Sequence, residues 1–424
     1  MSAASGDAAG WARLTEIFEN PELQMASFTI TEKGYALRDI AGKLLPIAIE
    51  DMKAGPANPK HIMAAATALL LARYNKNAAS IAMVSMDNCS HNGDILRGSV
   101  LDIAKAWCDN GFAPQGFVQW LSDSANVSFP WSMIDKITPR PNEGIAASLE
   151  ADGIEGMQPV ITSKGTYTAA FVNAEGPQYL VIEDSFPNSR PPLEDAGVIF
   201  TNRETVDNVE RMKVTTCLNP LHTALAVFGC LLGHKTIAAE MSDAPLRRLV
   251  EKIGYDEAMP VVVNPGVIDP QAFISEVLSE RFPNPYMPDA PQRIASDTSL
   301  KIGIRFGETI KSYRDRDGLD PAALTLIPLV IAGWMRFLLG MDDDGNAFEI
   351  PSDPMKGELQ AALAGIEFGK PESYSGQLEA ILRNETLFGV DLFSVNLGEK
   401  IEGMFCELIA GAGAVRTALE KYTK

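Results

Sequence analysis

The stretch Ser80–Gly93, SIAMVSMDNCSHNG, decides the fold class of this chain. It begins with a mostly apolar run, typical of a strand buried on both faces, and ends in a polar loop. A second buried strand is predicted upstream at Met25–Ile30, and helices are predicted at Tyr35–Met52, Pro59–Tyr74 and Ile95–Trp107. Strands that alternate with helices in this order predict a parallel α/β sheet.

The rest of the chain changes character twice. Short β-rich runs are expected at Val160–Ser163, Tyr167–Val172, Tyr179–Ile182 and Gly197–Phe200. After about residue 205 the pattern is helical, with main candidates at Leu221–Leu232, Ala244–Ile253, Pro270–Glu280, Leu300–Arg314, Ala322–Leu339, Lys356–Ala364 and Gly398–Tyr422. We therefore predict an α/β domain over residues 1–204 and a mostly helical domain over residues 205–424, with the first ten or so residues frayed.

Composition narrows the classes of partner. The formal net charge is −19, which argues against nucleic acid or an anionic membrane surface as the main partner. Five scattered cysteines without a CxxC motif predict reduced thiols in a cytoplasmic protein. The apolar runs Ala64–Ala72 and Thr223–Leu232 are too short to span a bilayer, and no secretory signal is evident.

The segment Lys213–His222, KVTTCLNPLH, gathers chemically active side chains. Asn219 and His222 are three apart and share a face if the segment is helical. Lys213 can act as an acid or base once desolvation lowers its pKa, and Asn219 can donate a hydrogen bond to an oxygen where negative charge develops. The alternative interpretation is a solvated lysine, an asparagine N-cap and a histidine on the first helical turn. Cys217 within it is either a nucleophile or, as we expect, a packed thiol.

Other motifs receive structural interpretations. The remaining histidines lack ligand spacing, so no metal site is predicted. The acidic run Asp342–Asn346 is interpreted as a connecting loop, because it lacks the full calcium-loop pattern. The glycine-rich Gly411–Arg416 follows a helical pattern and is rejected as a dinucleotide fingerprint.

Four blocks of sequence resemble the polyol-specific long-chain dehydrogenases and reductases, also called the mannitol dehydrogenase family. They are SFTITEKGY (Ser27–Tyr35), DNCSHNG with Asp87, Asn88, Asn92 and Gly93, FPWSMIDKITP (Phe129–Pro139), and the Lys213–Asn219–His222 segment. The blocks occur in family order across most of the chain.

The resemblance implies an NAD(P)-dependent, metal-free enzyme that interconverts a sugar ketone and a secondary alcohol. By position, Lys213 would be the acid or base, while Asn219 and His222 would bind the reacting oxygen and its neighbour. The cofactor would be NAD or NADP.

Four polar residues would contact the nicotinamide ribose under the same resemblance: Thr31, Glu32, Asp87 and Asn88. They directly follow the two predicted parallel strands, at the edge where open sheets bind ligands. Their alternative role is loop capping.

A second region, Arg281–Arg305, looks like the family's substrate side. Within it Arg293 and Lys301 are predicted to hold a carboxylate, the alternative being two surface cations. The sequence is most similar to the fructuronate reductase branch, so the expected reaction is D-fructuronate to D-mannonate, with mannitol 2-dehydrogenase or tagaturonate reductase as alternatives. A monomer or a homodimer is compatible with this interpretation.

The chain departs from the family pattern in three places. Trp131 stands where many members have an asparagine that helps to form the oxyanion site. The spacing from Lys213 to Asn219 is one residue longer than in much of the family, and we expect the turn before the helix to absorb the extra residue. No glycine-rich phosphate turn precedes the first strand, so the Rossmann half is expected to be incomplete. A truncated, non-catalytic sugar-acid-binding protein is the alternative from another class.

Overall fold

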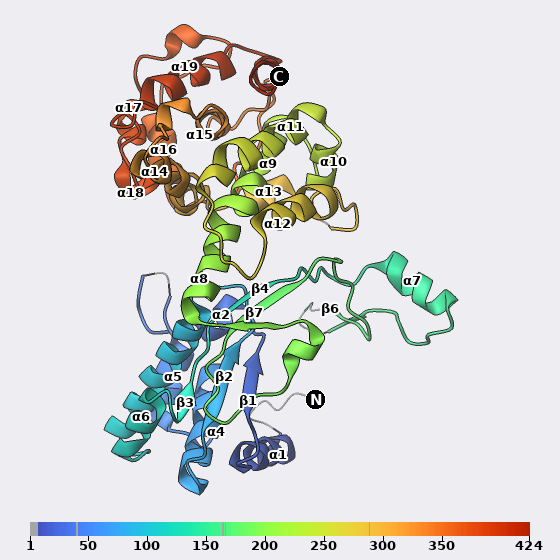
Figure 1. The fold of residues 1–424 in the computed structure, drawn as a ribbon, viewed down its shortest axis with the longest axis vertical. Coiled ribbons are helices and arrows are strands. Elements are labelled where there is room, and N and C mark those ends of the chain that lie inside the picture. The colour runs from blue at the N-terminus through green and yellow to red at the C-terminus, as the bar shows by residue number, and fades with distance from the viewer. Residues whose placement is uncertain (1–6, 40, 163–164, 166, 288) are drawn as a thin grey trace. The chain divides into compact units, whose positions relative to one another are not determined.

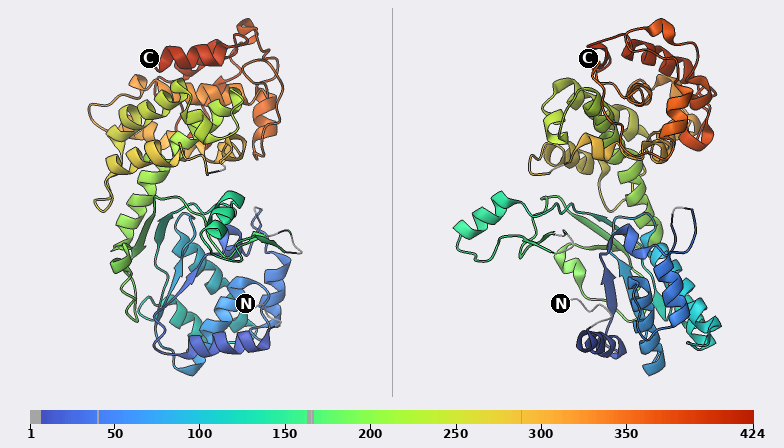
Figure 2. Two further views of the ribbon diagram at one scale, coloured as in Figure 1. Left: turned by 90° about the vertical axis from the view of Figure 1, so that its right-hand side faces the viewer. Right: turned by 180° about the vertical axis from the view of Figure 1, so that it is seen from behind.

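The computed structural model describes residues 7–39, 41–162, 165, 167–287 and 289–424 (Figures 1 and 2). The chain forms two compact units: the first combines Met1–Lys136 with Gln178–Glu210, and the second combines Ile137–Pro177 with Arg211–Lys424. The domain boundary predicted near residue 205 stays a prediction. It falls in helix α8 (Arg203–Met212), within which the chain passes from the first unit to the second after Glu210.

A three-stranded parallel sheet organises the first unit, as the strand–helix pattern predicts. Its strands, in the order β1-β2-β3, are Met25–Phe28, Ile81–Ser85 and Val127–Ser128. Met25 pairs with Ala82, and Phe28 pairs with Ser85, so the carboxyl ends of the first two strands meet at one edge. The helices between the strands include α4 (Ile62–Lys76), α5 (Asn92–Asp109) and α6 (Gln115–Ser122), which lie along the sheet in Figure 1.

Strand β2 separates two cores, because alternate side chains of a strand point to opposite faces. Ile81 and Met83 pack into the larger core with the helices, while Ala82 and Val84 pack into a second core with Ile182. Ile182 belongs to a second sheet with strands β4 (Ser132–Asp135), β7 (Tyr179–Glu183) and β8 (Ile199–Thr201). The first unit therefore consists of a helical layer and two sheets, with β2 in the middle.

Two local predictions in this unit are wrong. The helix expected over Tyr35–Met52 is two shorter helices, α2 (Thr31–Tyr35) and α3 (Pro46–Ala54). Gly42, at a φ of 77°, turns the chain between them, and Pro46 starts the second helix because its fixed φ suits a first turn. The amino-terminal segment is not frayed from Ala8 onward, because helix α1 (Ala8–Glu19) begins there with Asp7 as its N-cap. Residues 1–6 lie outside the described residues.

The segment 137–177 lies between β4 and β7 in the sequence but belongs to the second unit. It carries helix α7 (Glu143–Ala151) and the antiparallel pair β5 (Val160–Ile161) and β6 (Tyr167–Thr168). The two strands are shorter than the β-rich runs predicted there, and Ser163 lies outside the described residues. The helix was not predicted.

The remainder of the second unit is helical, as expected. Its main α-helices are α9 (Asn219–Leu231), α10 (Ile237–Met241), α11 (Ala244–Lys252), α12 (Pro270–Glu276), α13 (Pro291–Ile294), α14 (Glu308–Asp315), α15 (Leu326–Phe337), α16 (Lys356–Ala362), α17 (Glu379–Leu382), α18 (Glu385–Phe388), α19 (Gly398–Leu408) and α20 (Ala414–Tyr422). Among the described residues, four π-helical turns interrupt them: η2 (Lys213–Cys217), η3 (Ile253–Ala258), η5 (Val277–Arg281) and η7 (Gly303–Gly307). The predicted helices at 270–280 and 300–314 each contain one of these turns.

One continuous helical stretch, Arg203–Leu231, is long and apolar enough to cross a membrane by length and composition. Within the protein, 72% of its most apolar window is buried. It includes α9, whose side chains pack against α15 and other helices of the second unit. Its apolar character is thus accounted for by a place in the protein core.

Glu240 on α10 is a fully buried carboxyl group in this unit. Neither of its oxygens has a hydrogen-bond partner among the described residues. It lies against Gly229 of α9, where an added Cβ would come within 1.8 Å of Glu240 Oε1. Burial, followed by the charge of Asp243, raises the pKa of Glu240 to about 9, so the group is protonated at neutral pH.

Replacing Glu240 with Gln should flatten the pH dependence of stability. Between the ordinary pKa of 4.5 and the folded value of about 9, the folded protein holds a proton that the unfolded chain has lost. The free energy of unfolding of the unchanged protein should therefore fall by about 1.4 kcal/mol per pH unit through this group as pH rises. Urea unfolding at pH 5, 7 and 8.5 measures the difference. Glu358→Gln, at an exposed position on α16, is the control, and a slope shared by Glu240→Gln and the unchanged protein would contradict the assignment.

Candidate active site

Lys213 lies at the start of the π-helical turn η2. Leu218 N–H donates to the carbonyl of Lys213 at 3.1 Å, a span of five residues where an α-helix spans four. The turn between Lys213 and Asn219 is therefore one residue wider than an α-helical turn. That it absorbs a residue which the family lacks stays a prediction. Lys213 is only 1% exposed, so the interpretation as a solvated lysine is wrong.

Asn219 and His222 lie in the first turn of α9, three residues apart on one face. His222 N–H donates to the carbonyl of Leu218 at 3.0 Å, and the Thr223 hydroxyl donates to the carbonyl of Asn219 at 3.0 Å. Pro220 sits where its missing N–H costs no helical hydrogen bond. These contacts fix the backbone of the turn that carries both side chains.

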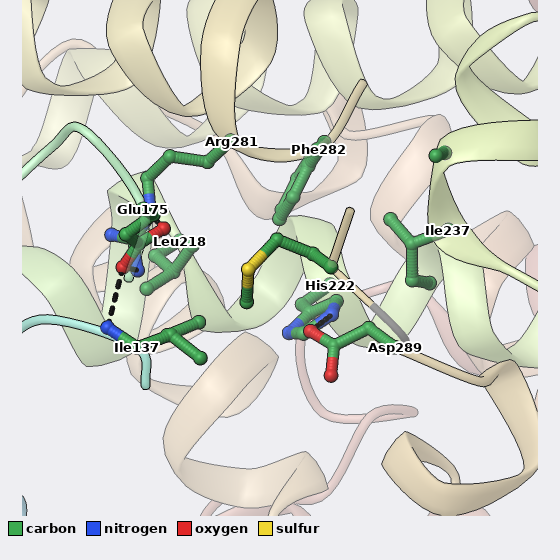
Figure 3. A pocket seen from close by; sticks show the side chains of 10 residues that line it. Ile137, Glu175, Leu218, His222, Ile237, Arg281, Phe282 and Asp289 are labelled. Atoms are coloured by element: carbon green, nitrogen blue, oxygen red, sulfur yellow. Dashed lines mark hydrogen bonds and ion pairs between the residues drawn. The ribbon is translucent and has the colours of Figure 1, made fainter. Parts of the chain in front are cut away.

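The imidazole of His222 is packed beside an aromatic ring and a carboxylate (Figure 3). Its ring lies 5.2 Å from that of Phe282, and Nε2 lies 3.6 Å from Asp289 Oδ2. Nε2 is enclosed and has no hydrogen-bond partner among the described residues. Burial lowers the pKa of His222 to about 4, with Asp289 opposing and Arg305 adding to the shift. His222 is therefore neutral at neutral pH and can donate or accept a hydrogen bond.

A small cavity opens beside His222, lined by residues of the second unit. Its volume is about 40 Å³, and a water molecule needs roughly 10–15 Å³, so the cavity has room for a few waters. Across it from His222, Arg281 binds Glu175 through two hydrogen bonds of 3.0 Å. The same carboxylate accepts from Ile137 N–H at 2.7 Å, which Figure 3 shows as a dashed line. This buried pair holds the segment 137–177 on η5.

The two predicted substrate-binding cations have partners of their own. Arg293, on α13, is 67% exposed and forms an ion pair with Asp289. Lys301 follows a 3-10 turn, and its Nζ donates to the carbonyl of Ser296 at 2.6 Å. Burial and the charge of Arg305 lower the pKa of Lys301. Their role in substrate binding stays a prediction.

Residues near His222 were missed as candidates: Asp289, Glu175, Arg281 and Arg305. The two arginines mark the ends of the region that resembles the family's substrate side, but nothing in their spacing distinguishes them. Arg305 could have been noticed as the one charge in the run GIRFG. Asp289 and Glu175 become recognisable only through contacts made far along the chain.

The four predicted cofactor residues lie at the carboxyl edge of the parallel sheet in the first unit. Thr31, Glu32 and Asn88 are exposed there, while Asp87 is buried. The carboxylate of Asp87 accepts from Ile30 N–H at 2.8 Å, from Thr31 N–H at 2.9 Å and from the hydroxyl of Tyr35 at 2.6 Å. Asp87 therefore caps the loop, and cofactor contact by all four residues stays a prediction.

Two of the resembling blocks contact each other in this unit. The Asn92 amide donates to Ser132 Oγ at 2.9 Å and accepts from Ser132 N–H at 3.0 Å. An added Cβ on Gly93 would lie 2.4 Å from the carbonyl of Phe129, so only glycine fits. Trp131 stacks on His91 at 4.0 Å, and its indole N–H is enclosed without a partner among the described residues.

The motifs given structural interpretations have clear contacts. The Asp343 carboxylate accepts from Val415 N–H at 2.8 Å and Arg416 N–H at 3.0 Å, so it occupies the amino end of α20 behind the glycine-rich run. Cys217 is fully buried, and burial raises the pKa of its thiol to about 12, as suits a packed thiol. Over the described part of the chain, no three His, Cys, Asp or Glu side chains gather to hold a metal ion.

Family models match most of the chain. Residues 3–195 match the mannitol dehydrogenase Rossmann domain, and residues 205–403 match the mannitol dehydrogenase C-terminal domain. The chain belongs to the mannitol dehydrogenase family. A D-mannonate oxidoreductase from Thermotoga maritima is 53% identical over 99% of this chain and 78% of the relative. A D-mannonate oxidoreductase from Escherichia coli is 30% identical over 88% of this chain and 70% of the relative.

Solved structures of the family share the fold. Mannitol 2-dehydrogenase from Pseudomonas fluorescens, in a ternary complex with NAD and D-mannitol, superposes with a TM-score of 0.65 at 27% identity, over 98% of this chain and 77% of that one. A substrate-free D-sorbitol dehydrogenase gives 0.77 at 25% identity, over 96% and 77%. The predicted family and fold class, a Rossmann-like α/β domain with a mostly helical domain, are confirmed. The chain is an oxidoreductase that acts on CH–OH groups.

His222 should remain neutral down to a pH of about 4. The chain has four histidines, so ring signals of ¹³C-labelled histidine can be followed against pH, with His222→Gln assigning the signal. Asp289→Asn should lower the His222 pKa further because it removes a negative neighbour, and Arg305→Met should raise it because it removes a positive one. A His222 that titrates near 6.5 in the unchanged protein would contradict this description.

Proposed function

We propose that this chain is an NAD(H)-dependent oxidoreductase that interconverts D-fructuronate and D-mannonate. The observation that carries the proposal is the burial of Lys213, one π-helical turn before Asn219 and His222. A desolvated lysine is suited to proton transfer at neutral pH. The Thermotoga maritima relative, a D-mannonate oxidoreductase, supports a sugar acid as the substrate.

Three side chains of the second unit would each have a separate role at the reacting carbon. In the reductive direction, Lys213 Nζ supplies the proton to the carbonyl oxygen. The side-chain amide of Asn219 donates to the same oxygen as negative charge develops. Neutral His222 orients the neighbouring hydroxyl, and the positive charges of Arg293 and Lys301 favour an acidic substrate.

Bound NADH would supply the hydride. Thr31, Glu32 and Asn88 would contact it, since they are exposed at the carboxyl edge of a parallel sheet, where dinucleotides bind. The Pseudomonas fluorescens mannitol 2-dehydrogenase forms its ternary complex with NAD, which supports this choice of cofactor. Asp87 would contribute indirectly, because its carboxylate holds the backbone of Ile30 and Thr31.

Replacing Lys213 with Ala or Met should lower kcat for D-fructuronate reduction by roughly 10²- to 10⁴-fold, the usual contribution of a general acid or base. Met keeps most of the buried volume, so it separates lost chemistry from lost packing. NADH oxidation at 340 nm measures the rate, and D-mannonate binding should persist. Lys370→Ala, at an exposed site, is the control and should leave the rate unchanged.

A substrate panel tests the acid specificity. D-fructuronate and D-tagaturonate carry a carboxylate, whereas D-fructose lacks one, and the same ketone reduction can be measured with all three. Turnover of fructose at a rate comparable to the uronates would overturn the proposed substrate. If the chain binds D-mannonate but neither binds nor oxidises NADH, a sugar-acid-binding role replaces the enzymatic one.

A further inference from the structure

Arg305 differs from the other arginines near His222 in how its charge is balanced. Three arginines depress the pKa of His222 through their charge: Arg305, Arg293 and Arg281. Arg281 is paired with Glu175, and Arg293 is paired with Asp289. Among the described residues, no carboxylate lies within ion-pair distance of Arg305. Its charge is therefore the one that is not compensated.

The π-helical turn η7 aims Arg305 at α9. On one side of the turn, Gly303 and Gly307 press against the backbone of α18, where an added Cβ would lie 2.7 Å from the carbonyl of Leu387 and 1.8 Å from that of Phe388. Arg305 is two residues from each glycine and so lies on the other side. Its Nη1 donates to the hydroxyl of Thr223.

Thr223 connects Arg305 to the predicted reaction site. Its hydroxyl accepts from Arg305 and donates to the carbonyl of Asn219 at 3.0 Å. Thr223 also directly follows His222 in α9. The guanidinium is thereby fixed beside the turn that carries Asn219 and His222, while its other N–H groups stay available for a planar anion.

Arg305 is partly buried without a carboxylate partner among the described residues, and this affects its pKa. Desolvation lowers the pKa of Arg305 to about 10, and no neighbouring carboxylate raises it again. An arginine in this state gains from an incoming anion, because a charge-assisted pair replaces lost hydration. Burial and the charge of Arg305 also lower the pKa of Lys301. Lys301 therefore belongs to the same positively charged region.

We propose that Arg305 is the specificity-determining residue of this enzyme, binding the carboxylate of the sugar acid through its guanidinium. The inference rests on the proposed function and refines it. Arg293 and Lys301 then contribute positive charge around the site, and Arg305 makes the direct contact. Neutral ketoses would leave this guanidinium unpaired, which disfavours them.

Steady-state kinetics of Arg305→Met test the assignment in the full chain. Loss of a charge-assisted pair should raise KM for D-fructuronate by roughly 10- to 100-fold, with a smaller change in kcat. Arg305→Lys keeps the charge but loses the planar guanidinium, so its KM should lie between those of the unchanged protein and Arg305→Met. Arg293→Met should raise KM less than Arg305→Met, and Arg314→Met, an exposed arginine on α14, should have no effect.

Two results would overturn the proposal. One is a fall in kcat and in melting temperature with KM unchanged, which would make Arg305 a structural support of α9. The other is an equal effect on D-fructuronate and D-fructose. If Arg305→Met fails to fold, Arg305→Lys decides by the same KM comparison.

The failure of the proposed function is distinguishable. If the unchanged protein does not oxidise NADH with D-fructuronate, that function fails, and calorimetric binding of D-mannonate tests Arg305 by itself. Binding weakened roughly 10-fold or more in Arg305→Met would support the anion site, and equal binding would overturn it.

Discussion

One backbone hydrogen bond, from Leu218 N–H to the carbonyl of Lys213, sets the register of the predicted site. It closes a π-helical turn, which accommodates one residue more than an α-helical turn. The π-helical turn ends at Cys217, and regular α-helix begins at Asn219. The turn is supported from two sides, by packing against η3 and η7 and by the Thr309 hydroxyl, which donates to the carbonyl of Thr215 at 3.3 Å.

The same backbone geometry recurs at three basic residues of the second unit. Lys213 begins η2, Arg281 ends η5, and Arg305 lies in the middle of η7. π-helical turns are rare interruptions of α-helix and are frequent at functional sites. At η7 the reason for the distortion is visible, because its glycines allow backbone contact with α18 that any side chain would prevent. The helical unit thus departs from regular geometry at the positions that carry these positive charges.

Local sequence patterns predicted the parts of the molecule that depend on local forces. The apolar runs at β1 and β2 and the spacing of Asn219 and His222 needed no distant partner. By contrast, the segment 137–177 belongs to the second unit and is joined to it by the pairing of Glu175 with Arg281, 106 residues away. The helix predicted at 35–52 was wrong although the sequence contains helix breakers there: Gly42 and Pro46 interrupt its apolar pattern. Asp87 could not be assigned from sequence, because a capping and a ligand-binding carboxylate look the same.

The distribution of charge would let a chain with a net charge of −19 accept the sugar acid that we propose as its substrate. Exposed carboxylates more than about 8 Å from the site are largely screened at physiological ionic strength. What an incoming carboxylate meets is the local balance around His222, where Glu175 compensates Arg281 and Asp289 compensates Arg293. The charge left over is that of Arg305, held beside the neutral imidazole by Thr223. Protonation of His222 would add a second positive charge there, and the same arginine charges that favour an acid oppose that protonation.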